Sequence, residues 1–454
     1  VNFHVVAPVR VRTMNPQDSE QLEKDTTSPA EQSTLLEDQQ SLRDWRVQCS
    51  AAFIIVGVVW GTYCYLNLTA AFEADTSLQW TKHSTSAMAT IATMCETLGL
   101  VFIGPFSDSV DQKLLLTVNV WVVFAGMLFL SFCRNIAQIM LAVSSMALVK
   151  GILWPCIGAL VANNVSPPAQ DHTFLIASIG SRIGDILASV SLSWLLLRVA
   201  LDWRHAVTVE LVCIMFIVAA GYAISPTSIA EPKDRAPSIG AQFSKAGRLL
   251  VDLDGWLAFF TLVGTYFAWA LQSYLVVLLS DIFNLDPGAA AGYSACFPVG
   301  CVLGLACGAI NSALLGQNFG RLMHVVQACV GVVAMVVLSL GSLSLMTTVI
   351  LLGTAGFGFV VPAYAPYLIY AAHCVPTDRA FRLAVLDGVA SLFSVALTFS
   401  YGSMRASSET PVAWKLYGAT AMGLIIATVA MAVLYWRLRN SQRSLDDDAF
   451  VHTA

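Results

Sequence analysis

The stretch LLLTVNVWVVFAGMLFLSFC, residues 114–133, contains no charged side chain and is flanked by two basic residues, Lys113 and Arg134. A helix needs roughly 20 apolar residues to cross the hydrocarbon core of a bilayer. The same character extends over the whole chain of 454 residues, which is 57% hydrophobic and 12% charged, with a mean hydropathy of +0.70. Water-soluble domains do not have this composition. The sequence therefore predicts a protein that crosses a membrane several times.

Further apolar stretches of similar length predict twelve membrane helices. Helices are expected because lipid leaves the backbone to satisfy its own hydrogen bonds, and because the stretches are too long for barrel strands. The expected helices cover residues 47–72, 84–106, 114–133, 137–161, 171–197, 205–224, 255–280, 288–311, 322–342, 345–373, 383–403 and 411–436.

The two halves of the chain carry similar landmarks. Pro155 and Pro362 are separated by 207 residues, and Trp203 and Trp414 by 211. These offsets indicate a six-helix unit written twice. We therefore expect an all-α membrane protein of twelve transmembrane helices in two pseudo-symmetric six-helix bundles. The expected parts are a disordered cytoplasmic tail at 1–46, an N-terminal bundle at 47–224, a cytoplasmic linker at 225–254, a C-terminal bundle at 255–436 and a cytoplasmic tail at 437–454.

The distribution of Lys and Arg predicts the orientation. If the N-terminus is cytoplasmic, sixteen basic residues lie on the cytoplasmic side and six on the opposite side. Because positive charge accumulates in cytoplasmic loops, both termini of this multi-pass protein are expected in the cytoplasm. Met14 is the expected native start.

The polar N-terminal segment contains a candidate sorting signal. In EQSTLL, Glu31 precedes the pair Leu35 and Leu36 by four residues. This spacing resembles the dileucine signal read by vesicle adaptors, although two leucines can also follow a glutamate by chance. An adaptor partner would place the protein in an endolysosomal or vacuolar membrane; the plasma membrane is the alternative.

Several motifs resemble one transporter family. The segment GPFSDSVDQK, residues 104–113, resembles the loop signature of the major facilitator superfamily, which runs G-x-x-x-D followed by basic residues. KGILWPCIGALVANNVSPPAQD, SIGSRIGD and DWRHA resemble its organophosphate:phosphate antiporter branch, which includes glycerol-3-phosphate transporters. The resemblance covers about residues 47–436. It implies the major facilitator fold, alternating access and exchange against phosphate, with helices 1, 4, 7 and 10 lining the cavity.

The resemblance also implies an arginine on the first and on the seventh helix, holding phosphate. This chain has no Lys or Arg between Arg46 and Lys82, or between Arg248 and Arg321. Solute recognition must therefore rest on other side chains.

A different set of ionisable residues falls inside the expected helices. Glu96, Lys150, Arg182 and Asp185 lie near mid-membrane, and Glu210 and Asp387 lie nearer helix ends. At that depth each must face a partner or a water-filled cavity. Lys150 either forms a packing ion pair with Glu96 or Asp185, or faces the cavity as a counter-charge for the solute. Arg182 and Asp185 share one helix face and either pair or contact solute, while Glu96, Asp185 and Asp387 are candidates for proton coupling or ion pairing.

Uncharged polar and aromatic residues add to this set. Tyr63 and Asn67 form a stripe on the first helix, and Trp269 and Gln272 form one on the seventh. Amide and aromatic groups at matching places suit a small polar ligand, although ordinary helix packing produces the same spacing. The predicted substrate-binding residues are thus Lys150, Arg182, Tyr63, Asn67, Trp269 and Gln272.

A gate is expected at the cytoplasmic face, where Asp108 could pair with Arg379 or Arg382. We expect a monomeric secondary active transporter, embedded in the lipid bilayer, for a small anionic or zwitterionic metabolite. The alternatives are a receptor or assembly subunit on a transporter scaffold, and a proton-coupled amino-acid or carboxylate carrier. The sequence shows no metal-ligand cluster, nucleophile elbow or phosphate loop, so enzyme activity, a metal, a cofactor and nucleic-acid binding are not expected.

Overall fold

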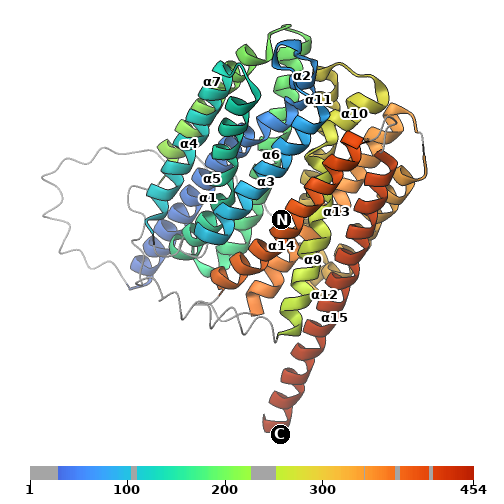
Figure 1. Cartoon of the computed structure of the whole chain (residues 1–454). Coiled ribbons are helices and arrows are strands. Elements are labelled where there is room, and N and C mark those ends of the chain that lie inside the picture. The colour runs from blue at the N-terminus through green and yellow to red at the C-terminus, as the bar shows by residue number, and fades with distance from the viewer. Residues whose placement is uncertain are drawn as a thin grey trace, which may run out of the picture.

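The structure, a computed structural model, describes residues 29–103, 110–225, 252–341, 343–373, 379–407 and 413–453. Side chains at 29–39, 103, 162, 167–168, 312, 317–318, 365–384 and 441–453 are outside this description. Every regular element of the described part is helical, as expected (Figure 1).

The first half of the chain forms α1 (Pro29–Asn67), α2 (Thr69–Ala74), η3 (Thr76–Leu78), α3 (Lys82–Leu98), η4 (Gly99–Ile103), α4 (Gln112–Phe132), α5 (Ile136–Asn164), α6 (Pro167–Leu197) and α7 (Trp203–Ile224). The second half forms α9 (Leu253–Gln272), α10 (Leu275–Phe283), α11 (Pro287–Ser294), α12 (Cys296–Ser339), α13 (Leu345–His373), α14 (Arg379–Ser407) and α15 (Ala413–Thr453). The end of the molecule where α2, α10 and α11 lie, at the top of Figure 1, is called the upper end.

The described residues contain 11 helices long and apolar enough to cross a membrane, or 12 when the bent pair α9 and α10 counts as one span. That pair bends by 51° after Gln272, inside the helix expected at 255–280. The expected helices 288–311 and 322–342 both lie largely within α12, whose backbone leaves helical geometry at Gly316. The number of spans therefore agrees with the sequence, and Gly316 lies between two expected helices, whereas the bend after Gln272 interrupts an expected helix.

The first helix begins earlier than expected. Helical backbone starts at Pro29, within the expected N-terminal tail. Proline is well tolerated in the first turn of a helix, and the Ala, Glu, Gln and Leu residues that follow are strong helix formers. At the other end of the chain, α15 runs on to Thr453, through most of the expected C-terminal tail.

Buried apolar side chains form one core within α1 to α7 and two cores centred on the second half. Within the halves, α1 packs against α6 and α7, α12 against α13, and α9 against α15. The halves meet where α3 packs against α14 and where α6 packs against α11 and α12. Side chains on α1, α6, α9 and α11 consequently face one another in the middle of the molecule.

Candidate functional site

The first ion pair of the central region joins α5 to α3. Lys150 Nζ lies 2.9 Å from Glu96 Oε2, and the two side chains are 17% and 36% exposed. The helices approach closely because position 151 is glycine: a Cβ there would lie 2.0 Å from the Glu96 carbonyl oxygen. Lys150 Nζ also lies 4.5 Å from the centre of the Tyr63 ring. Of the partners expected for Lys150, the structure selects Glu96, and it adds an aromatic face.

The second ion pair lies within α6. Arg182 Nη1 is 3.5 Å from Asp185 Oδ2, and both side chains are only 3% exposed. The same guanidinium lies 4.6 Å from the centre of the Trp269 ring, which the second half contributes. Gly184 lets α6 pack closely against α1, because a Cβ there would lie 2.6 Å from the Val56 carbonyl oxygen. The contact with Trp269 places the pair between the two halves of the protein.

A small cavity of about 10 Å³ lies beside these pairs. Its polar wall comes from both halves, with Tyr63, Asn67, Asp185 and Ser189 from the first and Gln272 and Ser294 from the second. Gln272 Nε2 donates to Asp185 Oδ2 across the interface. Asn67 Oδ1 accepts from Ser189 at 3.1 Å and from Ser294 at 3.2 Å. A volume near 10 Å³ has room for about one water, so the cavity is too small in this structure to hold a solute.

All six predicted substrate-binding residues meet in this region. Two of the predicted proton-coupling or ion-pair candidates, Glu96 and Asp185, lie there as the acids of the two pairs. Asp387 lies elsewhere, where it accepts a hydrogen bond of 2.6 Å from the Tyr266 hydroxyl between α14 and α9.

The predicted gate and sorting signal are not tested by the structure. Asp108 lies outside the described residues, as do the side chains of Arg379 and Arg382. Glu31, Leu35 and Leu36 lie in α1, but their side chains are outside the part of the chain that the structure describes.

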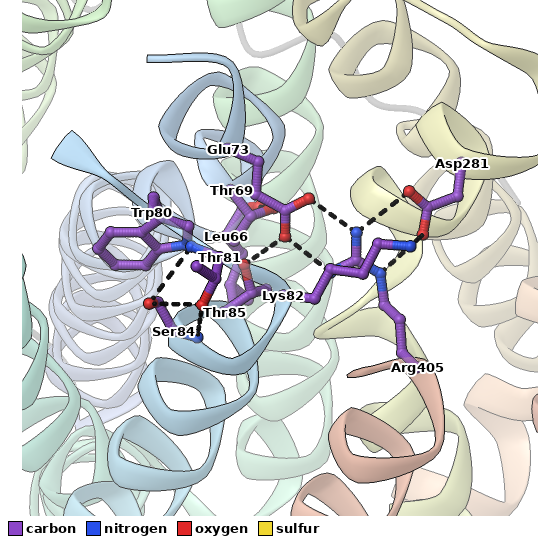
Figure 2. Close-up of polar contacts among 10 residues, drawn as sticks. All are labelled: Leu66, Thr69, Glu73, Trp80, Thr81, Lys82, Ser84, Thr85, Asp281 and Arg405. Atoms are coloured by element: carbon purple, nitrogen blue, oxygen red, sulfur yellow. Dashed lines mark hydrogen bonds and ion pairs between the residues drawn. The ribbon is translucent and has the colours of Figure 1, made fainter. Parts of the chain in front are cut away.

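A cluster that the sequence did not predict joins the halves at the upper end. Figure 2 shows Arg405 between Glu73 and Asp281. The Arg405 guanidinium donates to both Glu73 oxygens at 2.7 and 2.8 Å, and to Asp281 at 2.8 and 3.2 Å. Lys82 lies 3.8 Å from Asp281, and the Thr85 hydroxyl donates to Glu73. We call Glu73, Lys82, Asp281 and Arg405 the upper latch.

The sequence does not predict the latch, because its members lie far apart in the chain and because Lys82 and Arg405 fall outside the expected helices 84–106 and 383–403. The one available signal was the position of Glu73 and Asp281 at the upper ends of apolar stretches. Arg405 is only 3% exposed, so two carboxylates from opposite halves share one buried cation.

A second upper cluster lies within the first half, around Asp75. Asp75 Oδ2 accepts from the Trp203 indole at 2.9 Å and from Arg204 Nη1 at 3.2 Å. Burial by itself would raise the pKa of Asp75, but hydrogen bonds from Ser77 and Trp203 and the Arg204 charge outweigh it and lower the pKa to about 2. The cluster ties the loop after α2 to the start of α7.

We predict that Asp75→Asn destabilises the protein at neutral pH by about 2–3 kcal/mol, because one pKa unit corresponds to about 1.36 kcal/mol and the unfolded pKa is near 3.9. A lowered folded pKa contributes stability above the unfolded value, and that stability is lost as the pH falls through about 2. Thermal unfolding in detergent at neutral and acidic pH tests this. The difference in melting temperature between Asp75→Asn and the wild type should narrow on acidification. Asp202 is the more exposed partner of Arg204, so Asp202→Asn should change the melting temperature little at either pH.

The model of the family described as the Major Facilitator Superfamily matches residues 49–397. The chain belongs to the Major Facilitator Superfamily. This match places it among secondary transporters rather than enzymes. No group of three or more His, Cys, Asp or Glu side chains in the described part of the chain could hold a metal ion.

Solved structures of superfamily transporters share the fold. A bacterial homologue of the human lysosomal transporter Spinster, in an inward-facing and unoccupied conformation, is 15% identical with a TM-score of 0.57, over 87% of this chain and 95% of that one. A point mutant of the nucleoside transporter NupG is 11% identical with a TM-score of 0.61, over 86% of this chain and 99% of that one. No curated protein sequence matches this chain. The similarities establish the major facilitator fold and leave the solute to be argued from the site.

Proposed function

We propose that this superfamily member carries a small zwitterionic solute, of the amino-acid type, through the cavity between its halves. The observation that supports this most strongly is the charge balance of the site. Lys150 is paired with Glu96 and Arg182 with Asp185, so two cations and two acids surround the central region. The empty site carries no net charge.

A net-neutral solute with separated charges fits this balance. An ionised group inside a membrane protein is tolerated when a partner compensates it. Next to Lys150 and Glu96, a solute carboxylate can take the ammonium as its partner while a solute ammonium takes the carboxylate. A lone anion would instead leave a protein acid uncompensated, which is costly in a buried site.

Two unpaired polar atoms support the same class of solute. Within the described residues, Arg182 Nε is a buried donor without an acceptor, and Gln272 Oε1 is a buried acceptor without a donor. Buried polar atoms are normally hydrogen-bonded. A bound carboxylate can accept from Arg182, and a bound ammonium can donate to Gln272.

Exchange of organophosphates against phosphate, which the resemblance implied, fits the site less well, because phosphate needs unpaired cations and both cations here already have an acid. We also propose that both termini are cytoplasmic, which puts the upper end on the opposite side. The adaptor signal at Glu31, Leu35 and Leu36 and the monomeric state are part of the same proposal.

Counterflow uptake into proteoliposomes tests the solute class. The panel contains neutral amino acids, dicarboxylates, sugar phosphates and inorganic phosphate. We expect neutral zwitterions to exchange, and Lys150→Gln to reduce their uptake at least about tenfold, because it leaves Glu96 without its cation. Lys113→Gln removes an exposed charge at the start of α4 and is the matched control.

Uptake of phosphate or dicarboxylates without zwitterions would overturn the proposed solute class. If the folded wild type moves no member of the panel, the receptor alternative gains support. The double variant Lys150→Gln/Glu96→Gln restores the balance of charge and should fold like the wild type while remaining inactive.

A further inference from the structure

Glu210 is a buried carboxyl that neither ion pair uses. It lies on α7, within the span Trp203–Ile224, and is 1% exposed. Both of its side-chain oxygens lack a hydrogen bond within the described part of the protein. The Trp60 indole on α1 and the Ser191 hydroxyl on α6 face it. Trp60 Nε1 is itself unsatisfied, and the Ser191 hydroxyl donates instead to the Leu187 carbonyl.

No charged group compensates Glu210 from the described helices around it. The titratable neighbours are thiols, Cys64 on α1 and Cys213 on α7 itself. On α6, Arg182 and Asp185 pair with each other. On α4, the only charged residue is Lys113, in the first turn. That turn lies near the opposite end of α7, where the Tyr222 hydroxyl contacts Thr117.

We propose that Glu210 is a proton-binding site, protonated in the closed state seen here and deprotonated when the upper end opens. An ionised carboxyl with no cation and no formed hydrogen bond is strongly disfavoured in a membrane interior, whereas the protonated form is neutral. This assignment depends on the fold and on the surroundings of Glu210, and not on which solute the protein carries.

The position of Glu210 links this proton to the cavity. Trp60 lies on α1 one turn before Tyr63, and Cys64 directly follows Tyr63, which lines the cavity. Loss of the proton creates a carboxylate that needs donors, and the unsatisfied Trp60 indole N–H on α1 already faces it. A shift of α1 toward such a bond would move Tyr63 and Asn67 in the cavity wall. Proton release and reshaping of the solute site are thereby coupled.

Labelling with dicyclohexylcarbodiimide tests the proposal on the wild-type, full-length protein in proteoliposomes. The reagent reacts with protonated carboxyls: the carboxyl oxygen bonds the central carbon, and the proton moves to a reagent nitrogen. Rearrangement then leaves a stable N-acylurea that peptide mass spectrometry locates. We expect Glu210 to be labelled at neutral pH at least about threefold more than Glu96 or Asp185, which are ion-paired. Glu210→Gln is the blank for the assignment of the peptide.

The second arm repeats the labelling in Arg405→Ala, with Ser294→Cys as a maleimide reporter of upper-end opening. We expect labelling of Glu210 to fall at least about threefold once the reporter shows opening. Two results would overturn the proposal. Absence of label on wild-type Glu210 at neutral and acidic pH would mean that the group is not protonated. Equal labelling in the closed and opened states would mean that the proton never leaves.

Discussion

Arg405→Ala is expected to lower the free energy of unfolding by about 3–5 kcal/mol, the usual cost of removing one member of a buried ion pair. Arg405 is 3% exposed and donates four hydrogen bonds to Glu73 and Asp281. Its loss leaves two carboxylates from opposite halves facing each other. We therefore also expect the upper end to open more often.

Thermal unfolding in detergent measures the loss of stability, and maleimide labelling of Ser294→Cys measures the opening against the background of the native cysteines. Ser294 lies in the cavity wall at the end of α11. Lys415→Ala removes an exposed cation at the start of α15 and should change neither quantity by much. Unchanged melting and unchanged labelling in Arg405→Ala would show that the upper latch does not hold the halves together.

Restoring neutrality separates the two effects of the latch. The triple variant Arg405→Met/Glu73→Gln/Asp281→Asn contains no uncompensated charge within the Glu73–Asp281–Arg405 group, and buried ion pairs can often be replaced by neutral residues at little cost. We expect it to regain most of the lost stability. The upper end should still open more readily than in the wild type, because the bidentate contacts between the halves are gone.

The second large effect is expected at Arg182 and Asp185. Arg182→Gln leaves the Asp185 carboxylate, whose side chain is 3% exposed, with Gln272 as its cross-interface donor. We expect a loss of stability of about 3–5 kcal/mol together with loss of uptake. Asp185→Asn should be similarly harmful, because it leaves the guanidinium against the Trp269 ring without its acid.

The double variant Arg182→Gln/Asp185→Asn distinguishes a role of the pair in helix packing from a role in solute recognition. It removes both charges and should recover much of the stability, whereas uptake should remain lost if the pair contacts solute. Melting temperature and counterflow uptake, measured on the same preparation, distinguish the two roles. Near-normal uptake by the double variant would assign the pair to helix packing alone.

For Lys150, the sequence predicted that a partner exists but not which residue it is. Its depth in an apolar stretch predicted a partner, but the sequence left Glu96 and Asp185 as equal alternatives. The choice was made by Gly151, which brings α5 onto α3 at Glu96. Asp185 is instead occupied by Arg182 and by Gln272 from the other half.

By itself, the sequence determined the all-helical membrane architecture and the number of spans, and it predicted that the ionisable residues at mid-membrane have partners. Each follows from local physics: apolar length selects a membrane helix, and an ionisable group at that depth must find a partner. Only the tertiary structure decided which acid serves which cation, where α9 bends, and that Arg405 joins Glu73 to Asp281. These features depend on contacts between residues up to 332 positions apart, and no periodicity within one helix encodes such contacts.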